Sequence, residues 1–434
     1  MSSLIKLIKK TYQMAGAQEG KVVMGNVASL SWLQVITYAL PMILLPYLFR
    51  MLGAEKFGLI AFAQAFVQYF MILTDYGFNV SATKEISLYQ DDHTKVRRIF
   101  SAIMTAKIGL FFISFIILST LVYFVPKFRG DWLVYMLCFP AVLGSTLFPV
   151  WFFQGMEKMK YIAQLNIIGS IFYAICIFTF IHKPQDYLLV PFISSCASLI
   201  VGLFGQYFVI KKFSISPYFP SYKEIQQQLE AGWNIFIAAL AVNAYTTTRV
   251  FAVGMLTNNT LTGYYSIAER IANAVQTFPL YSFSQAIFPR LSNIYQKNHL
   301  KAFNMMQQIQ QITITISLIC LPIVFILANL LVSIVCGGNY PAAVLSVRLL
   351  IIAVFFVSAN AFRVQFLLVC GETKIYSRIH MTMAVIGLPL ILLLISFYSY
   401  VGAAMATVAI EGGIFTLTYF AVKRLTFSLI TPSK

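Results

Sequence analysis

Five basic residues inside long apolar stretches are the side chains of this sequence that are best placed to do chemistry. They are Arg270, Arg249, Arg348, Arg363 and Lys107. A charged group at the centre of a bilayer costs about 3 kcal/mol on insertion scales, so it is kept where it faces protein or a water-filled cavity. Guanidinium groups stay charged and bind phosphate or carboxylate through paired hydrogen bonds. The five cations therefore indicate a cationic lumen for an anionic substrate.

The geometry of the predicted helices separates the roles of the arginines. Arg249 and Glu269 lie at the same depth, roughly 10 Å from the outer ends of consecutive helices, and are predicted to form an ion pair. Arg270 lies about 100° around the helix from Glu269, so it lacks an obvious partner and is the strongest candidate for contact with cargo. Arg348 and Arg363 are roughly 22 Å apart along one helix and are predicted to form two rungs on one cavity wall.

Two further acidic residues lie in the apolar stretches. Glu411, in the last stretch, is predicted to pair with a lumen arginine or to carry a coupling proton, and a neutral, hydrogen-bonded carboxyl is the alternative. Asp75 lies at the inner end of its helix, where the helix dipole disfavours an anion, so Lys84 or another base of the same loop is its expected partner. Lys107 and Arg363 have a second interpretation, because both are near enough to the cytoplasmic ends to reach the headgroups.

The elements that position these residues are predicted to be transmembrane helices. Hydrophobic residues make up 59% of the 434 residues and charged residues only 10%, whereas a soluble domain has roughly 25% charged residues. Unbroken apolar windows of about 20 residues indicate helices and exclude a membrane barrel, whose strands alternate. Twelve windows are predicted to span the membrane: 24–49, 57–80, 99–125, 132–153, 162–181, 187–210, 233–256, 262–288, 308–334, 343–368, 378–399 and 402–421.

The distribution of basic residues predicts the orientation. With the N-terminus in the cytoplasm, the inner segments carry 21 Lys and Arg residues and the outer loops carry five, as the positive-inside rule requires. This asymmetry predicts an even number of spans with both termini cytoplasmic. It also accounts for the net charge of +17, because scattered basic loops beside an anionic leaflet do not form a nucleic-acid-binding patch.

No catalytic residue, metal site or cofactor is predicted. The six cysteines and four histidines are dispersed and show no metal-ligand spacing. A membrane polysaccharide polymerase or glycosyltransferase is the rival enzyme, but it needs a large loop or domain, and the longest predicted outer loop has fewer than about ten residues. A proton or another cation stays open as a coupling ion.

Internal duplication predicts an all-α membrane protein with two pseudo-symmetric six-helix bundles around a central cleft. FFQGMEKMKY, with Gly155, has its counterpart LVCGETKIYS, with Gly371, about half a chain later, and repeated bundles are typical of transporters. The predicted units are an interfacial segment, an N-terminal lobe, a cytoplasmic linker with a surface helix, a C-terminal lobe and a cytoplasmic tail, at residues 1–23, 24–210, 211–232, 233–421 and 422–434.

The sequence DYGFNVSATKEIS at 75–87 resembles the signature of polysaccharide or O-antigen flippases. These transporters belong to the multidrug/oligosaccharidyl-lipid/polysaccharide (MOP) exporter superfamily. Supporting segments run along nearly the whole chain: GLIAFAQAFVQYF at 58–70, WFFQGMEKMKYI at 151–162, AGWNIFIA at 231–238, GYYSIAERI at 263–271 and FPRLS at 288–292.

This resemblance implies a multi-pass protein of the bacterial cytoplasmic (inner) membrane that moves an undecaprenyl-diphosphate-linked oligosaccharide between leaflets by alternating access. The implied partners are that lipid-linked sugar, the bilayer and other polysaccharide assembly proteins. The alternative within the same superfamily is an ion-coupled drug or cation antiporter of the MATE type. Cationic cargo would require buried acids to outnumber buried cations, and five buried Lys and Arg residues against three acids favour anionic cargo.

Overall fold

The computed structural model describes the backbone of residues 17–430 and the side chains of residues 40–277, 287 and 291–426. The predicted interfacial segment and cytoplasmic tail therefore lie partly outside the described residues. All regular elements of the described part are helices. They are α2 (Ala17–Asp75), α3 (Phe78–Leu88), α4 (His93–Phe124), α5 (Pro126–Arg129), α6 (Trp132–Cys138), α7 (Pro140–Leu147), α8 (Val150–Gly155), α9 (Lys160–Phe180), η1 (Pro184–Leu188), α10 (Leu189–Lys212), α11 (Tyr222–Thr246), α12 (Thr248–Leu256), α13 (Asn259–Lys297), α14 (His299–Ile326), α15 (Ala328–Cys336), α16 (Pro341–Val369) and α17 (Thr373–Ile430).

Two of these helices contain sharp breaks. Helices α2 and α17 have 59 and 58 residues, so each would be roughly 88 Å long if straight, far more than a bilayer is thick. Each is interrupted by one residue with a left-handed backbone, Gly53 with φ of 73° and Ser399 with φ of 56°. Glycine adopts this conformation without steric cost, whereas serine does so with strain. The breaks fall between pairs of predicted spans.

Every predicted span falls on helical segments of the structure, although some are interrupted. Within the described part, eight helices are long and apolar enough to cross a membrane, or nine if α11 and α12, bent by 50°, form one span. The window at 132–153 consists of three short helices because Pro140 and Pro149 interrupt the backbone hydrogen bonds. The part of the chain that the structure describes is thus all-helical, the protein is a multi-pass membrane protein, and twelve crossings stay a prediction.

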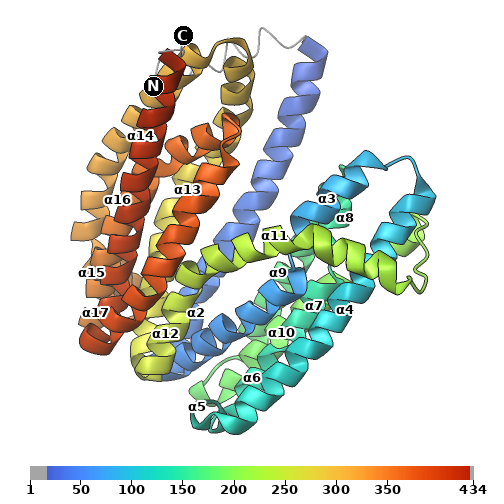
Figure 1. The fold of residues 1–434 in the computed structure, drawn as a ribbon. Helices are drawn as coiled ribbons and strands as arrows, with labels where there is room; N and C mark the ends of the chain where they lie inside the picture. Colours follow the sequence, from blue (N-terminus) through green and yellow to red (C-terminus); the bar gives the residue numbers. More distant parts are fainter. Residues whose placement is uncertain (1–16, 431–434) are drawn as a thin grey trace.

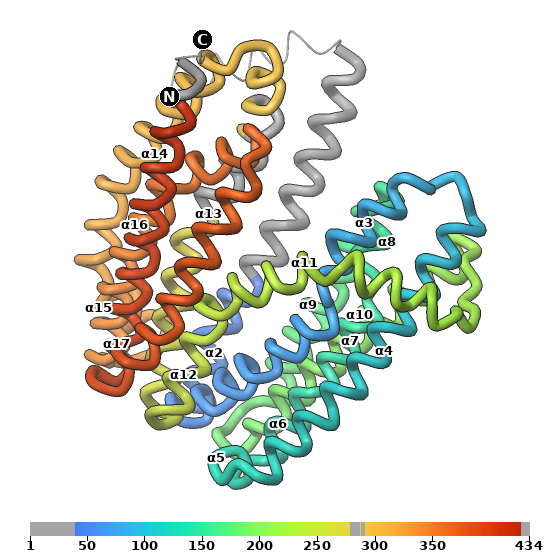
Figure 2. Tube along the Cα trace, in the orientation of Figure 1, coloured from blue at the N-terminus to red at the C-terminus, as the bar shows by residue number. Residues whose placement is uncertain are grey.

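The helices gather on two sides of the molecule. Figure 1 shows α3 to α10 on one side and α13 to α17 on the other, with α11 running between the two groups. We call α2 to α10 the N-terminal half and α12 to α17 the C-terminal half. Residues 213–221 are irregular, and residues 224–232, predicted as a surface helix of the linker, belong to α11 and continue directly into the next span. Figure 2 traces α11 from beside α3 and α4 to α12, so this helix joins the two halves.

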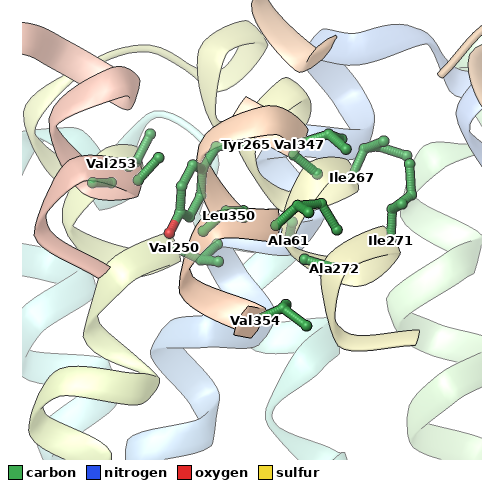
Figure 3. Packing of buried hydrophobic residues seen from close by; sticks show 14 of the residues in the cluster. Ala61, Val250, Val253, Tyr265, Ile267, Ile271, Ala272, Val347, Leu350 and Val354 are labelled. Atoms are coloured by element: carbon green, nitrogen blue, oxygen red, sulfur yellow. The ribbon is translucent and has the colours of Figure 1, made fainter. Parts of the chain in front are cut away.

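Buried apolar side chains hold each half together, while large apolar side chains on the outside are exposed as lipid contact requires. In the N-terminal half, Phe100, Trp151 and Phe152 pack in one cluster. In the C-terminal half, Tyr265 of α13 lies among valines and leucines of α12 and α16 (Figure 3). This packing fixes the depth of α12, α13 and α16, the helices that carry four of the five predicted lumen cations.

The two halves meet tightly where α2, after its break, crosses the start of α13. A Cβ atom at Gly58 would lie 2.5 Å from the Gly263 nitrogen and closer still to the Asn259 carbonyl oxygen. At Gly254 of α12, a Cβ would collide with the ring of Phe62. Small residues allow such close approach of membrane helices. We call this end of the molecule, formed by residues 54–62 and 254–263, the closed end.

Candidate cationic transport site

Arg270 lies at the interface between the halves. It projects from α13, and its Nη2 donates a hydrogen bond to Gln64 Oε1 of α2 at 3.3 Å. Its guanidinium carbon lies 5.7 Å from the ring centre of Phe57, where a cation–π contact stabilises the charge. None of the side chains that the structure describes forms an ion pair with it. Arg270 therefore keeps most of its hydrogen-bonding capacity for a ligand.

A small pocket surrounds the Arg270 guanidinium. Its volume is about 40 Å³, and four helices, α2, α9, α10 and α13, contribute to its walls. Gln64 and Tyr173 supply polar groups to the lining, and Leu48, Leu52 and Ile60 supply apolar ones. Arg270 is nevertheless an exposed residue, so it faces an opening and not packed core. The pocket has room for a water-sized group or one end of an anion, but not for a whole sugar.

Arg249 forms the predicted ion pair with Glu269. Their Nε and Oε1 atoms are 3.4 Å apart, and the side chains are only 13% and 17% exposed. Arg249 Nε also donates to the Thr246 carbonyl at 3.2 Å. Glu411 of α17 interacts electrostatically with the same guanidinium. Arg249 thus forms an ion pair with Glu269 and interacts with Glu411 from beyond ion-pair distance. The predicted ion pair is confirmed, and the expected cargo contact of Arg249 stays a prediction.

Arg348 and Arg363 do not form the expected two rungs on one wall. Arg348 lies against Phe325 of α14, with its guanidinium carbon 5.5 Å from the ring centre. Arg363 instead contacts two rings of α17, Phe415 at 4.7 Å and Tyr419 at 5.0 Å. The two side chains therefore project toward different neighbours of α16. One buried nitrogen of each, Arg348 Nε and Arg363 Nη1, lacks a hydrogen-bond partner among the described residues.

Lys107 and Asp75 interact electrostatically away from the other charges. Lys107 of α4 is only 3% exposed, so it neither reaches the headgroups nor lines an opening, and both expectations for it are wrong for this conformation. Its charge interacts with that of Asp75, whose carboxylate also accepts a hydrogen bond from the Gly77 backbone. Lys84, the expected partner of Asp75, is exposed. The basic partner of Asp75 is therefore Lys107 on a neighbouring helix, and not Lys84, which follows Asp75 closely in the sequence.

Several polar residues near these charges were not expected. Gln64 and Tyr173 adjoin Arg270, and Tyr245 Oη of α11 lies 2.7 Å from His380 Nδ1 of α17. Tyr245 also interacts electrostatically with Glu411. Gln64 is a lone amide in an apolar run, which could have drawn attention to it. Tyr245 and His380 are 135 residues apart, so only the packing of α11 on α17 reveals them.

Intramembrane cations between two groups of apolar helices define the class of protein: a multi-pass helical membrane transporter. The chain belongs to the family of polysaccharide biosynthesis proteins, whose family model matches residues 23–295. The resemblance to MOP-superfamily flippases that rests on DYGFNVSATKEIS is thereby confirmed, and the chain is a transporter and not an enzyme.

Relatives of similar length support this assignment. A protein of Escherichia coli (strain K12) called "Putative O-antigen transporter" is 30% identical over 395 residues, which cover 89% of this chain and 93% of that protein. A protein of the same name from Shigella dysenteriae is 26% identical over 404 residues, covering 92% and 99%.

Solved structures with the same fold come from the MOP superfamily. The structure titled "Lipid II flippase MurJ, inward closed conformation" has a TM-score of 0.73 at 14% identity and covers 91% of this chain and 87% of its own. An inward-facing multidrug resistance MATE family transporter has a TM-score of 0.69 at 12% identity, covering 91% and 99%. At these identities the likeness establishes the fold alone.

Proposed function

We propose that this protein flips a lipid-linked oligosaccharide from the inner to the outer leaflet of the bacterial cytoplasmic membrane. The carrier lipid is undecaprenyl diphosphate, and the sugar is a repeat unit of O-antigen or a related surface polysaccharide. The observation that carries the proposal is Arg270, an exposed guanidinium at the interface of the halves with a neutral amide as its hydrogen-bond partner. Guanidinium is well suited to bind a diphosphate by paired hydrogen bonds.

Alternating access fits the arrangement of the halves. Twelve crossings, in lobes at 24–210 and 233–421 with both termini cytoplasmic, would place the closed end on the outer face and a central cleft on the inner side. Cargo then enters from the inner leaflet, its diphosphate reaches Arg270, and the halves rock until the closed end opens. The polyprenyl tail stays in lipid throughout. Other polysaccharide assembly proteins supply the cargo and receive it.

Arg270→Ala should abolish most transport. Charge-assisted hydrogen bonds contribute about 1.5–3 kcal/mol, so we expect a roughly 10- to 100-fold lower flipping rate, with Arg270→Lys intermediate because a lysine is charged but cannot bind in a bidentate manner. The measurement is surface polysaccharide, together with accumulated lipid-linked intermediate, in a flippase-null strain that carries each variant.

Arg378→Ala is the matched control, because Arg378 is an exposed arginine in the first turns of α17. It should support normal surface polysaccharide. A wild-type amount of surface polysaccharide from the Arg270→Ala variant would contradict the assignment of Arg270 to the substrate site. Failure of the wild-type gene to restore surface polysaccharide in the flippase-null strain, with every repeat unit tried, would contradict the proposed function.

We also propose that proton movement through Glu411 drives the cycle. Arg249 can neutralise one of its two carboxylates, Glu269 and Glu411, so a proton on the other leaves the cluster neutral. In proteoliposomes with labelled cargo, a gradient of one pH unit supplies about 1.4 kcal/mol per proton and should accelerate wild-type transport. Glu411→Gln should transport at a rate that the gradient does not change. Equal acceleration of the variant by the gradient would assign coupling elsewhere.

A further inference from the structure

Two basic side chains of the N-terminal half bind main-chain carbonyls at helix ends of the C-terminal half. The first is Lys127 of the short helix α5, whose Nζ donates hydrogen bonds of 2.9 Å to the carbonyls of Met255 and Thr257. These carbonyls lie at the end of α12, where Thr257 is the C-terminal cap. The Lys127 side chain also passes Phe62, with Nζ 5.9 Å from the ring centre. Lys127 thus bridges the two halves at the closed end.

Arg50 makes the second bridge. It lies three residues before the break of α2, and its Nη2 donates a hydrogen bond to the Ile334 carbonyl in the last turn of α15. Gly337 caps that helix with φ of 74°, and a Cβ there would lie 3.1 Å from Arg50 Nε. The glycine therefore leaves room for the arginine to reach the carbonyl.

The chemistry of both bridges is the same. The last carbonyls of a helix have no partner within the helix, and they form the negative end of its dipole. A cation placed there satisfies these carbonyls and is attracted to the dipole. Each bridge joins a cation of one half to a helix end of the other, so both bridges break when the halves separate.

We propose that Lys127 and Arg50 form a two-point latch that holds the closed end shut and so sets how often the transporter opens toward the outer face. The inference rests on the proposed function for its alternating-access cycle. Because the acceptors are backbone carbonyls, substitutions on the C-terminal side cannot remove them. The two cations are therefore the side chains whose removal breaks the latch directly.

Other basic residues of the predicted outer loops have contacts within their own half. Arg129, also on α5, lies 5.6 Å from the Tyr123 ring of α4. Lys56 pairs with its neighbour Glu55 and lies over Tyr187. Arg129 and Lys56 carry the same charge as the latch residues at nearby positions, so they are matched controls.

The test is the distance between spin labels across the closed end. Cysteines at Gly130 and Leu330, placed in a variant without the six native cysteines, report on the end of α5 and the first turn of α15 in purified protein without cargo. A latch contact of about 1–2 kcal/mol predicts that Lys127→Ala raises the open-to-closed ratio roughly 5- to 30-fold. Arg50→Ala should act in the same direction, and the double variant should open most.

The controls decide between a latch and general disruption. Arg129→Ala and Lys56→Ala should leave the distance distribution unchanged, and Lys127→Met should open the protein like alanine although it keeps the aliphatic stem over Phe62. Distributions for the Lys127 and Arg50 variants equal to those of the controls would overturn the latch. Since no cargo is present, this outcome is independent of the Arg270 assay, which alone tests the proposed function.

Discussion

Arg249→Met should destabilise the protein by about 3–5 kcal/mol, because it leaves buried carboxylates without their counter-charge. Glu269 is 3.4 Å from Arg249 and its side chain is 17% exposed, so water cannot compensate for the loss. Glu411 also interacts electrostatically with Arg249, so removal of the arginine takes a counter-charge from both acids. Few single substitutions in this chain should cost more.

Substitution of the acidic partner, Glu269, should destabilise the protein less than Arg249→Met does. Glu269→Gln leaves Arg249 beside Glu411, so the arginine keeps a carboxylate partner and the glutamine stays polar. The double variant, Arg249→Met with Glu269→Gln, should be more stable than Arg249→Met alone because one of the two stranded charges is gone. This order of stabilities distinguishes the three-residue cluster from an isolated pair, in which both single variants would cost about the same.

Thermal unfolding of the purified variants in one detergent measures this order. Lys95→Ala is the control, because Lys95 and Asp92 form an exposed ion pair at 3.8 Å with side chains 54% and 44% exposed. Such surface pairs contribute about 0–1 kcal/mol. A change for Arg249→Met no larger than that for Lys95→Ala would show that the cluster does not stabilise the fold.

Much of the helical organisation follows from local sequence, and the long-range contacts do not. Apolar windows locate helices because a span must be apolar over its whole length, and Pro140 and Pro149 mark breaks because proline removes backbone hydrogen bonds. The gap between the last two predicted windows anticipates a break near residue 400, but not that a serine makes it, because serine rarely adopts a left-handed backbone. The continuity of 224–232 with the following span in α11 was not predicted for a different reason, since the polar residues of this segment indicate a surface helix.

The candidate site also contains contacts that the sequence predicts and contacts that it does not predict. Arg249 and Glu269 were predictable because consecutive helices of known direction place residues at matching depths. The electrostatic interaction of Asp75 with Lys107 was not predictable, because it depends on how α4 packs against α2. Arg348 and Arg363 show the limit most clearly: spacing along one helix gives their relative angle but not which neighbouring helix each side chain meets.

The latch and the glycine crossing perform different tasks at the same end of the molecule. Lys127 and Arg50 add attraction between the halves, while Gly58 and Gly263 remove the steric barrier that would keep α2 and α13 apart. The attraction between these two cations and a few carbonyls can change the ratio of closed to open protein only by a limited factor. Steric exclusion where the backbones of two helices cross can make the closed state inaccessible.

Gly58→Ala should therefore have the larger effect on closure. The new methyl group would meet backbone atoms of Asn259 and Gly263, which cannot move aside as a flexible side chain can. Overpacking of a core costs about 1–3 kcal/mol, and a collision between two backbones should lie at or above the upper end of that range. Because 1.4 kcal/mol is about tenfold in an equilibrium constant, we expect the closed state to be depopulated at least about 100-fold.

Both label distances and surface polysaccharide measure this effect, because a transporter that cannot shut its outer end cannot complete a cycle. Gly109→Ala is the matched control: it is also a glycine in a helix of the N-terminal half, and a Cβ there meets nothing within 4 Å. That change should be neutral or stabilising by up to about 1 kcal/mol, since alanine favours helix. If Gly58→Ala closed and transported like Gly109→Ala, the two halves would have to meet through contacts other than this crossing. Closure would then depend on the cationic latch, and the Lys127 variants would show the larger effect.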